Sequence, residues 1–253
     1  MLATTLTGSA TDAPPLLIAH GLFGSARNWN VIAKRLSDSR QVITVDMRNH
    51  GTSPRYQTQS YADMAGDLAE VIAAHGGRAD LLGHSMGGKA AMVLALGQPD
   101  LLRRLVVADI APVAYGHSQS HLIAAMRGVD LSRIETRRDA DVQLAGAVAE
   151  DGVRAFLLQS LDVKDRRWRL NLDVLEADMD AITGWPEGLS GQFEGPTLML
   201  SGAVSDYVLP AHRDTIRGHY PAARFAKIPG AGHWLHADKP REFEAAVRVF
   251  LAR

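Results

Sequence analysis

The 253-residue chain contains no cysteine. This absence excludes disulfide bonds, thiolate metal sites and a cysteine nucleophile, and it is typical of a reducing compartment. No apolar run approaches the roughly 20 residues that a membrane span requires, and the first residues lack the basic segment and apolar core of a signal peptide. The sequence therefore predicts a cytoplasmic protein with no membrane partner.

Charge of one sign is also scarce. The formal net charge is −1, and no long run of like charge occurs. A nucleic-acid partner is therefore not expected, because such partners require a basic surface. The hydrophobic content of 46% is that of a globular protein, and the length suffices for one α/β domain with an insertion.

Short apolar runs alternate with helical patterns through much of the chain. The runs predicted as strands are 16–19, 41–47, 79–84, 105–110, 197–201 and 223–228, with a short edge strand at 2–7. The patterns predicted as helices between or after them include 61–75, 86–97, 211–219 and 240–251. This alternation predicts a mostly parallel sheet that is wound by right-handed crossovers and flanked by helices.

The alternation stops at Pro112. From there to about Gly195 the sequence has helical patterns and no comparable strand-like run, with helices expected at 118–128, 137–149, 151–160 and 171–183. We therefore expect a core formed by residues 1–111 and 196–253, with residues 112–195 inserted as a helical cap.

Gly83-His-Ser-Met-Gly87 fits G-x-S-x-G, the sharp strand-to-helix turn that exposes a nucleophilic serine. An apolar run precedes it and a helical run follows it, which is the context that the turn requires. Ser85 is the candidate nucleophile. The same stretch also fits most of a phosphate-binding loop, but Ala90 stands where that loop needs a hydroxyl for Mg²⁺.

A serine hydroxyl needs a general base and donors for the oxyanion. His233 lies in a glycine-rich loop after the last predicted strand and is the candidate base, with His236 as the alternative. The expected oxyanion donors are the backbone N–H groups of Met86, after the nucleophile, and Leu22, in the loop after an earlier strand.

Two carboxylates could orient the base. Asp109 ends the strand after the elbow helix, and Asp206 follows the strand at 197–201. Both positions lie at the carboxyl edge of the sheet, where α/β proteins bind ligands. Spacing alone leaves the choice open. His117 and His121 are four residues apart without the glutamate of a zinc-binding helix, so no metal site is predicted.

Together these residues resemble the α/β-hydrolase superfamily, and within it the YbfF-type bacterial esterases. The motifs that carry the resemblance are His20-Gly-Leu-Phe-Gly-Ser25, Asp46-Met-Arg-Asn-His-Gly51, Gly83-His-Ser-Met-Gly-Gly-Lys-Ala90, Asp109-Ile-Ala-Pro112 and Gly230-Ala-Gly-His-Trp234. The resemblance implies a capped esterase for short acyl esters or thioesters, with the acid after the strand that carries Asp109. The sequence departs from the superfamily at Gly202-Ala-Val-Ser205, where the usual acid is replaced by Ser205 and Asp206 comes one residue later.

We interpret the chain as a serine carboxylesterase with a Ser85-His233-Asp109 triad that acts on a small-molecule ester. Ser205 is expected to assist the acid, and Phe23 and Trp234 are candidate pocket residues. This chemistry needs no metal or organic cofactor. The alternatives are a thioesterase, a C–C hydrolase or a lyase on the same fold, and a binding protein without catalysis, because a fold does not fix a function.

Overall fold

The computed structural model describes residues 1–252 and has a central seven-stranded sheet of order β1-β3-β2-β4-β5-β8-β9. All neighbouring strands are parallel except β1 and β3, which makes β1 an antiparallel edge. The strands are β1 (Thr4–Thr7), β2 (Leu16–Ala19), β3 (Val42–Val45), β4 (Ala79–His84), β5 (Leu102–Ala108), β8 (Thr197–Gly202) and β9 (Ala223–Ile228). The prediction of a mostly parallel sheet flanked by helices is confirmed.

The central strands are apolar throughout because both of their faces are covered. Every residue of β2, β3, β4 and β8 is buried. Successive residues point to opposite faces, so Leu17 and Leu81 belong to one core cluster while Leu16 and Leu82 belong to the other. Burying one such side chain contributes about 1.5–3 kcal/mol.

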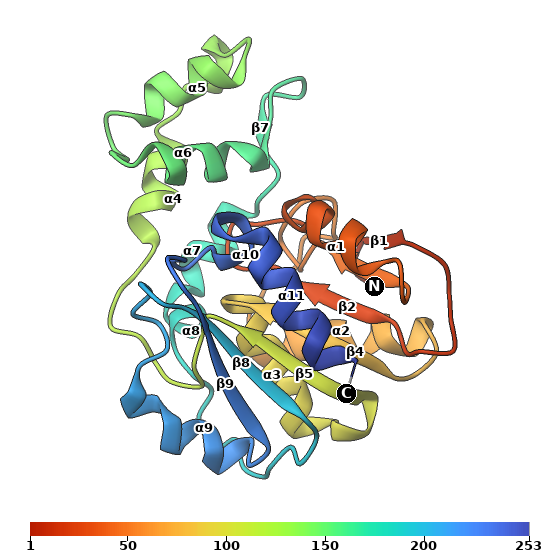
Figure 1. Ribbon diagram of the computed structural model, residues 1–253. Helices are drawn as coiled ribbons and strands as arrows, with labels where there is room; N and C mark the ends of the chain where they lie inside the picture. The colour runs from red at the N-terminus through yellow and green to blue at the C-terminus, as the bar shows by residue number, and fades with distance from the viewer. Residues whose placement is uncertain (253) are drawn as a thin grey trace.

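A layer of helices covers each face of the sheet (Figure 1). The first core cluster draws on α2 (Tyr61–Ala74), α3 (Met86–Gly97) and α9 (Arg213–His219), and the second on α1 (Asn30–Leu36), α10 (Leu235–Asp238) and α11 (Pro240–Leu251). No helix within residues 1–252 is long and apolar enough to cross a bilayer.

The chain between β5 and β8 forms a separate group of short helices, of which α4, α5 and α6 stand above the sheet in Figure 1. The helices of this segment are α4 (Ser120–Arg127), α5 (Arg137–Leu144), α6 (Asp151–Leu157), α7 (Leu172–Ala177) and α8 (Met179–Thr183). They are shorter than the sequence predicted, and the helix expected at 171–183 is broken at Asp178.

The inserted segment also contains one very short strand pair, which the sequence did not predict. β6 (Leu161–Asp162) and β7 (Arg167–Trp168) pair in antiparallel fashion, between the helices predicted at 151–160 and 171–183. Strands of two residues are too short to produce a recognisable alternation of apolar and polar residues. In β7, the Trp168 indole N–H donates to the Met126 carbonyl.

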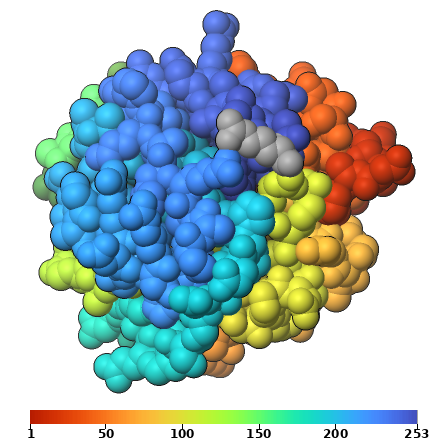
Figure 2. All heavy atoms as spheres, turned by 60° about the horizontal axis from the view of Figure 1, so that its bottom comes forward, coloured from red at the N-terminus to blue at the C-terminus, as the bar shows by residue number. Residues whose placement is uncertain are grey.

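The edge of the sheet at which the parallel strands begin is covered by loops. In Figure 2 that edge faces the viewer, and the loops that lead into the strands, near residues 100 (yellow), 195 (cyan) and 220 (blue), cover it.

Candidate active site

Ser85 lies in the sharp turn between β4 and α3, with φ 51° and ψ −119°. A positive φ is strained for a residue with a Cβ. The neighbouring glycines make this turn possible: a Cβ on Gly83 would lie 2.2 Å from the Gly87 carbonyl oxygen, and a Cβ on Gly87 would lie 2.5 Å from the Ala19 carbonyl oxygen. The close approach of backbones therefore explains the glycine spacing of the motif.

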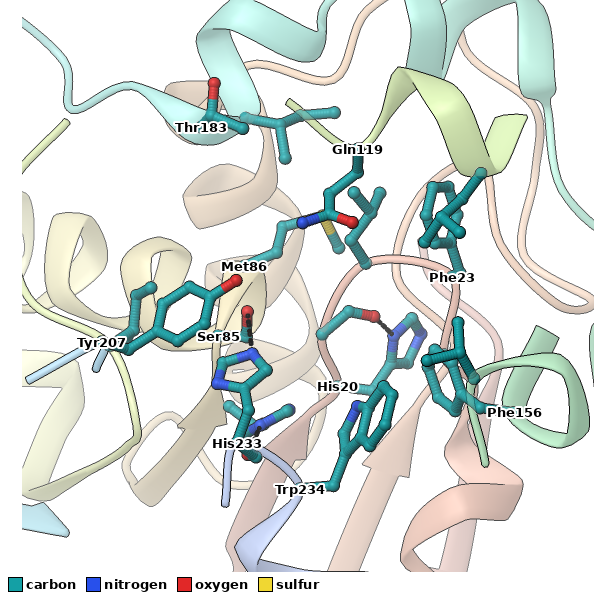
Figure 3. Close-up of a pocket in the computed structure, with 18 of the residues that line it drawn as sticks. His20, Phe23, Ser85, Met86, Gln119, Phe156, Thr183, Tyr207, His233 and Trp234 are labelled. Atoms are coloured by element: carbon teal, nitrogen blue, oxygen red, sulfur yellow. Dashed lines mark hydrogen bonds between the residues drawn. The ribbon is translucent and has the colours of Figure 1, made fainter. Parts of the chain in front are cut away.

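Three strand ends bring Ser85, His233 and Asp109 together. Ser85 follows β4, Asp109 follows β5, and His233 lies in the loop between β9 and α10. The His233 Nε2 atom is 3.1 Å from the Ser85 Oγ (Figure 3). The His233 Nδ1 atom is 2.8 Å from the Asp109 Oδ2. An imidazole that donates from Nδ1 to a carboxylate presents Nε2 as the acceptor for the serine hydroxyl.

Asp109 is fully buried and its carboxylate is held from several sides. It accepts hydrogen bonds from the Gly202 N–H at 3.0 Å and from the Ser205 hydroxyl, in addition to His233. Asp206, the other candidate acid, is exposed, and within residues 1–252 no hydrogen bond joins it to His233. The alternative base His236 is buried and stacks on Trp29 at 4.1 Å.

The residues of the two expected oxyanion donors, Leu22 and Met86, line the same cavity as Ser85. Neither the Leu22 N–H nor the Met86 N–H has a hydrogen-bond partner in the described part of the chain, so both can serve a substrate oxygen. The loop that carries Leu22 approaches closely, because a Cβ on Gly21 would lie 3.1 Å from the Ser85 Cβ.

Two buried histidines shape this loop. His20 donates from Nδ1 to the Gly21 carbonyl and accepts the Met47 N–H at Nε2. His50 accepts the Phe23 N–H at 3.1 Å, which holds Phe23 at φ 63°. No role for His50 was predicted from the sequence. Its only signal was its place in the Asp46–Gly51 motif, because its partner Phe23 lies 27 residues away.

Because several histidines are buried in their neutral form, we expect the protein to lose stability in acid. Burial lowers the pKa of His50 and of His236 from 6.5 to about 3. Between pH 6.5 and 3 the unfolded chain therefore binds more protons than the folded one, and the free energy of unfolding falls as the pH falls through this window. At pH 4 we expect a loss on the order of a few kcal/mol for each histidine.

Thermal unfolding between pH 7 and pH 4 measures this effect. The variant His236→Phe should show a weaker dependence of Tm on acid than the wild type, because it removes one of the buried histidines whose pKa is lowered. The same substitution at the exposed His121 should leave the dependence unchanged. An acid dependence in His236→Phe equal to that of the wild type would contradict the expectation.

A cavity of 460 Å³ opens beside Ser85. This volume is typical of a site for a small molecule. Both predicted pocket residues, Phe23 and Trp234, line it, and the Trp234 ring lies 5.2 Å from that of Phe156 (Figure 3). Residues from the segment between β5 and β8 also line it, among them the apolar or aromatic Tyr115, Leu122, Val148, Val153, Phe156 and Ile182.

Lys89, which fitted the phosphate-loop alternative, is buried in the cavity wall. Its ammonium group donates to the carbonyls of Thr183 and Gly184 at the end of α8 and lies 4.8 Å from the centre of the Tyr115 ring. Burial lowers the pKa of Lys89 from 10.5 to about 7. Lys89 thus caps a helix and leaves the nucleotide interpretation without its phosphate ligand.

Comparison with known proteins identifies the family of this chain. Residues 14–240 match the family described as alpha/beta hydrolase fold. The chain belongs to the α/β-hydrolase family. It is 45% identical to the sn-1-specific diacylglycerol lipase ABHD11 of Mus musculus over 98% of this chain and 83% of the relative. It is also 40% identical to the esterase YbfF of Escherichia coli K12 over 94% of this chain and 92% of the relative.

A solved structure described as a marine microorganism esterase superposes with a TM-score of 0.92, at 37% identity, and covers 99% of this chain and 100% of its own. The resemblance to α/β hydrolases is therefore confirmed. The prediction that the chain is an enzyme, a serine hydrolase of carboxylic esters, is confirmed at the level of the family and of these relatives. Among residues 1–252 no three His, Asp or Glu side chains form a group that could hold a metal ion.

Proposed function

We propose that the protein is a serine carboxylesterase that hydrolyses short acyl esters through an acyl-enzyme intermediate. The observation that carries the proposal is the chain of hydrogen bonds from Ser85 Oγ through His233 to Asp109. In the first step, Ser85 Oγ attacks the ester carbonyl while His233 Nε2 accepts its proton. His233, now protonated, then donates that proton to the departing alcohol.

The negative charge that develops on the carbonyl oxygen is assigned to the N–H groups of Leu22 and Met86. Donors that are already in place cost no reorganisation when the charge forms, which makes them effective in the transition state. Water, activated by His233, then attacks the acyl-enzyme, and Ser85 is released with its proton restored. Asp109 keeps the imidazole in the tautomer that both half-reactions need.

The segment 112–195 is assigned the role of a cap over the acyl pocket. This assignment is supported by the cavity, whose lining combines strand-end residues of the core with apolar side chains of that segment. A cap of this kind excludes water from the oxyanion and sets a limit on the length of the acyl chain. The esterase and lipase names of the relatives support an ester as the substrate.

The acyl-length profile tests both the pocket and the reaction. On p-nitrophenyl esters of increasing length, kcat/KM should fall sharply once the acyl chain exceeds the cavity of 460 Å³. Acyl-CoA thioesters of the same lengths serve as the comparison. A fluorophosphonate, which reacts with activated serines, should abolish hydrolysis of every substrate. Activity that survives the probe, or a rate independent of chain length, would contradict the proposal, and faster thioester hydrolysis would reassign the substrate.

A further inference from the structure

Hydrogen bonds hold His233 at its backbone carbonyl and at one edge of its imidazole ring. The His84 Nε2–H donates to the His233 carbonyl oxygen at 2.8 Å, and the Asp109 carboxylate accepts from Nδ1 at 2.8 Å. Neither contact fixes the tilt of the ring, because the terminal torsion of an imidazole is soft. The direction in which Nε2 faces Ser85 therefore depends on what lies against the ring faces.

Tyr207 lies against one of these faces. The centroids of the Tyr207 and His233 rings are 3.9 Å apart and the rings are inclined by only 19°, so they are stacked. The other near ring is that of His84, at 4.8 Å and 42°, which is a tilted contact and not a parallel one. Figure 3 shows Tyr207 beside His233 on the wall of the cavity, away from Trp234.

Three polar contacts hold Tyr207 itself. Its N–H donates to the Ser205 hydroxyl at 3.3 Å, and its carbonyl accepts the Tyr115 hydroxyl at 2.7 Å. Its phenol oxygen lies 2.9 Å from the Nε2 of His117. Ser205 also donates to Asp109. The short loop that carries Ser205 and Tyr207 therefore contacts both the Asp109 carboxylate and the His233 ring.

We propose that Tyr207 is a positioning residue for His233, which keeps the imidazole in the orientation that serves Ser85. This inference rests on the proposed function. A stacked ring resists tilting, and small misplacements of a reacting group are costly in rate. In addition, the face of a phenol ring attracts a cation, so it favours the imidazolium that forms in the transition state. Tyr207 contacts the base and takes no proton itself.

Substitution of the ring tests the role. Tyr207→Met fills similar space without a flat face and should lower kcat on a short p-nitrophenyl ester about tenfold, with KM nearly unchanged. Tyr207→Phe keeps the stack and should recover most of that rate. Tyr56→Met is the matched control, because Tyr56 is also half-buried and lies outside the cavity lining. Tyr207→Leu is a second variant in case the methionine variant does not fold.

Proton NMR gives a readout that a purely structural role would not change. The downfield signal of the Nδ1–H proton in the His233–Asp109 hydrogen bond should persist in Tyr207→Phe and should broaden or vanish in Tyr207→Met at a temperature where both are folded. Such a loss, together with the lower kcat, supports the role.

Three results would overturn the role of Tyr207. The first is a wild-type kcat in Tyr207→Met, and the second is a raised KM with unchanged kcat, which would make Tyr207 only a pocket wall. The third is a Tyr207→Phe variant as slow as Tyr207→Met, which would assign the effect to the hydroxyl. Wild-type activity that resists a fluorophosphonate would instead remove the proposed function, and the role of Tyr207 with it.

Discussion

Replacing Ser85 by alanine should lower kcat on a short p-nitrophenyl ester by a factor on the order of 10⁴ or more. The substitution removes the atom that forms the acyl-enzyme and leaves the oxyanion donors in place, so only a small residual rate should remain. The measurement is steady-state hydrolysis with purified protein. The fold should persist, because the substitution removes only the Oγ atom and disturbs no packing contact.

The exposed Ser190 offers a matched control. Ser190→Ala should keep the wild-type rate and should still react with a fluorophosphonate, whereas Ser85→Ala should not react. Circular dichroism and Tm must agree between the two variants. If Ser85→Ala retained a tenth of the wild-type activity, the acyl-enzyme mechanism would have to be abandoned.

Replacing Asp109 by asparagine should be nearly as damaging, with a loss in kcat on the order of 10⁴. Asparagine tolerates the positive φ of 53° at this position, so the backbone need not move. However, its amide group cannot accept the hydrogen bonds that Asp109 receives from both the Gly202 N–H and the His233 Nδ1–H. The imidazole then loses the partner that fixes its tautomer, and Nε2 no longer accepts the serine proton.

Two neighbours of Asp109 set the scale for this result. Asp206→Asn should be only mildly impaired, because Asp206 is exposed. Ser205→Ala should fall between the two, since it removes one hydrogen bond to the Asp109 carboxylate. Kinetics of the three variants on one ester measure the order. If Asp206→Asn were slower than Asp109→Asn, the role of the acid would pass to Asp206.

The strands of the sheet could be predicted closely from the sequence. β4 and β9 have the predicted bounds, 79–84 and 223–228. β4 is a mostly apolar run because it is buried on both faces, whereas β9, at the edge of the sheet, is only partly buried. The helix α11, expected at 240–251, begins and ends there as well. The position of Ser85 followed from the glycines on either side of it, which are a local requirement of the turn.

The inserted segment was harder to predict for a local reason. Its helices are short, and their ends are set by contacts with distant residues. Asp178, where the predicted helix at 171–183 breaks, accepts the Gln59 N–H through its carboxylate. Trp168, which lies outside the predicted helices, belongs to β7, and its indole N–H donates to the Met126 carbonyl. Such contacts leave no periodicity in the sequence.

The sequence by itself determined the fold class, the candidate nucleophile and the candidate base, because each depends on short-range pattern: apolar runs, a glycine-flanked serine and a histidine in the last loop. Only the tertiary structure decided which carboxylate lies against His233, that His50 holds the oxyanion loop, and that Tyr207 stacks on the imidazole. These facts join residues that are far apart in the chain. Their distances follow from the order and register of β4, β5, β8 and β9, which bring the strand ends to one edge of the sheet.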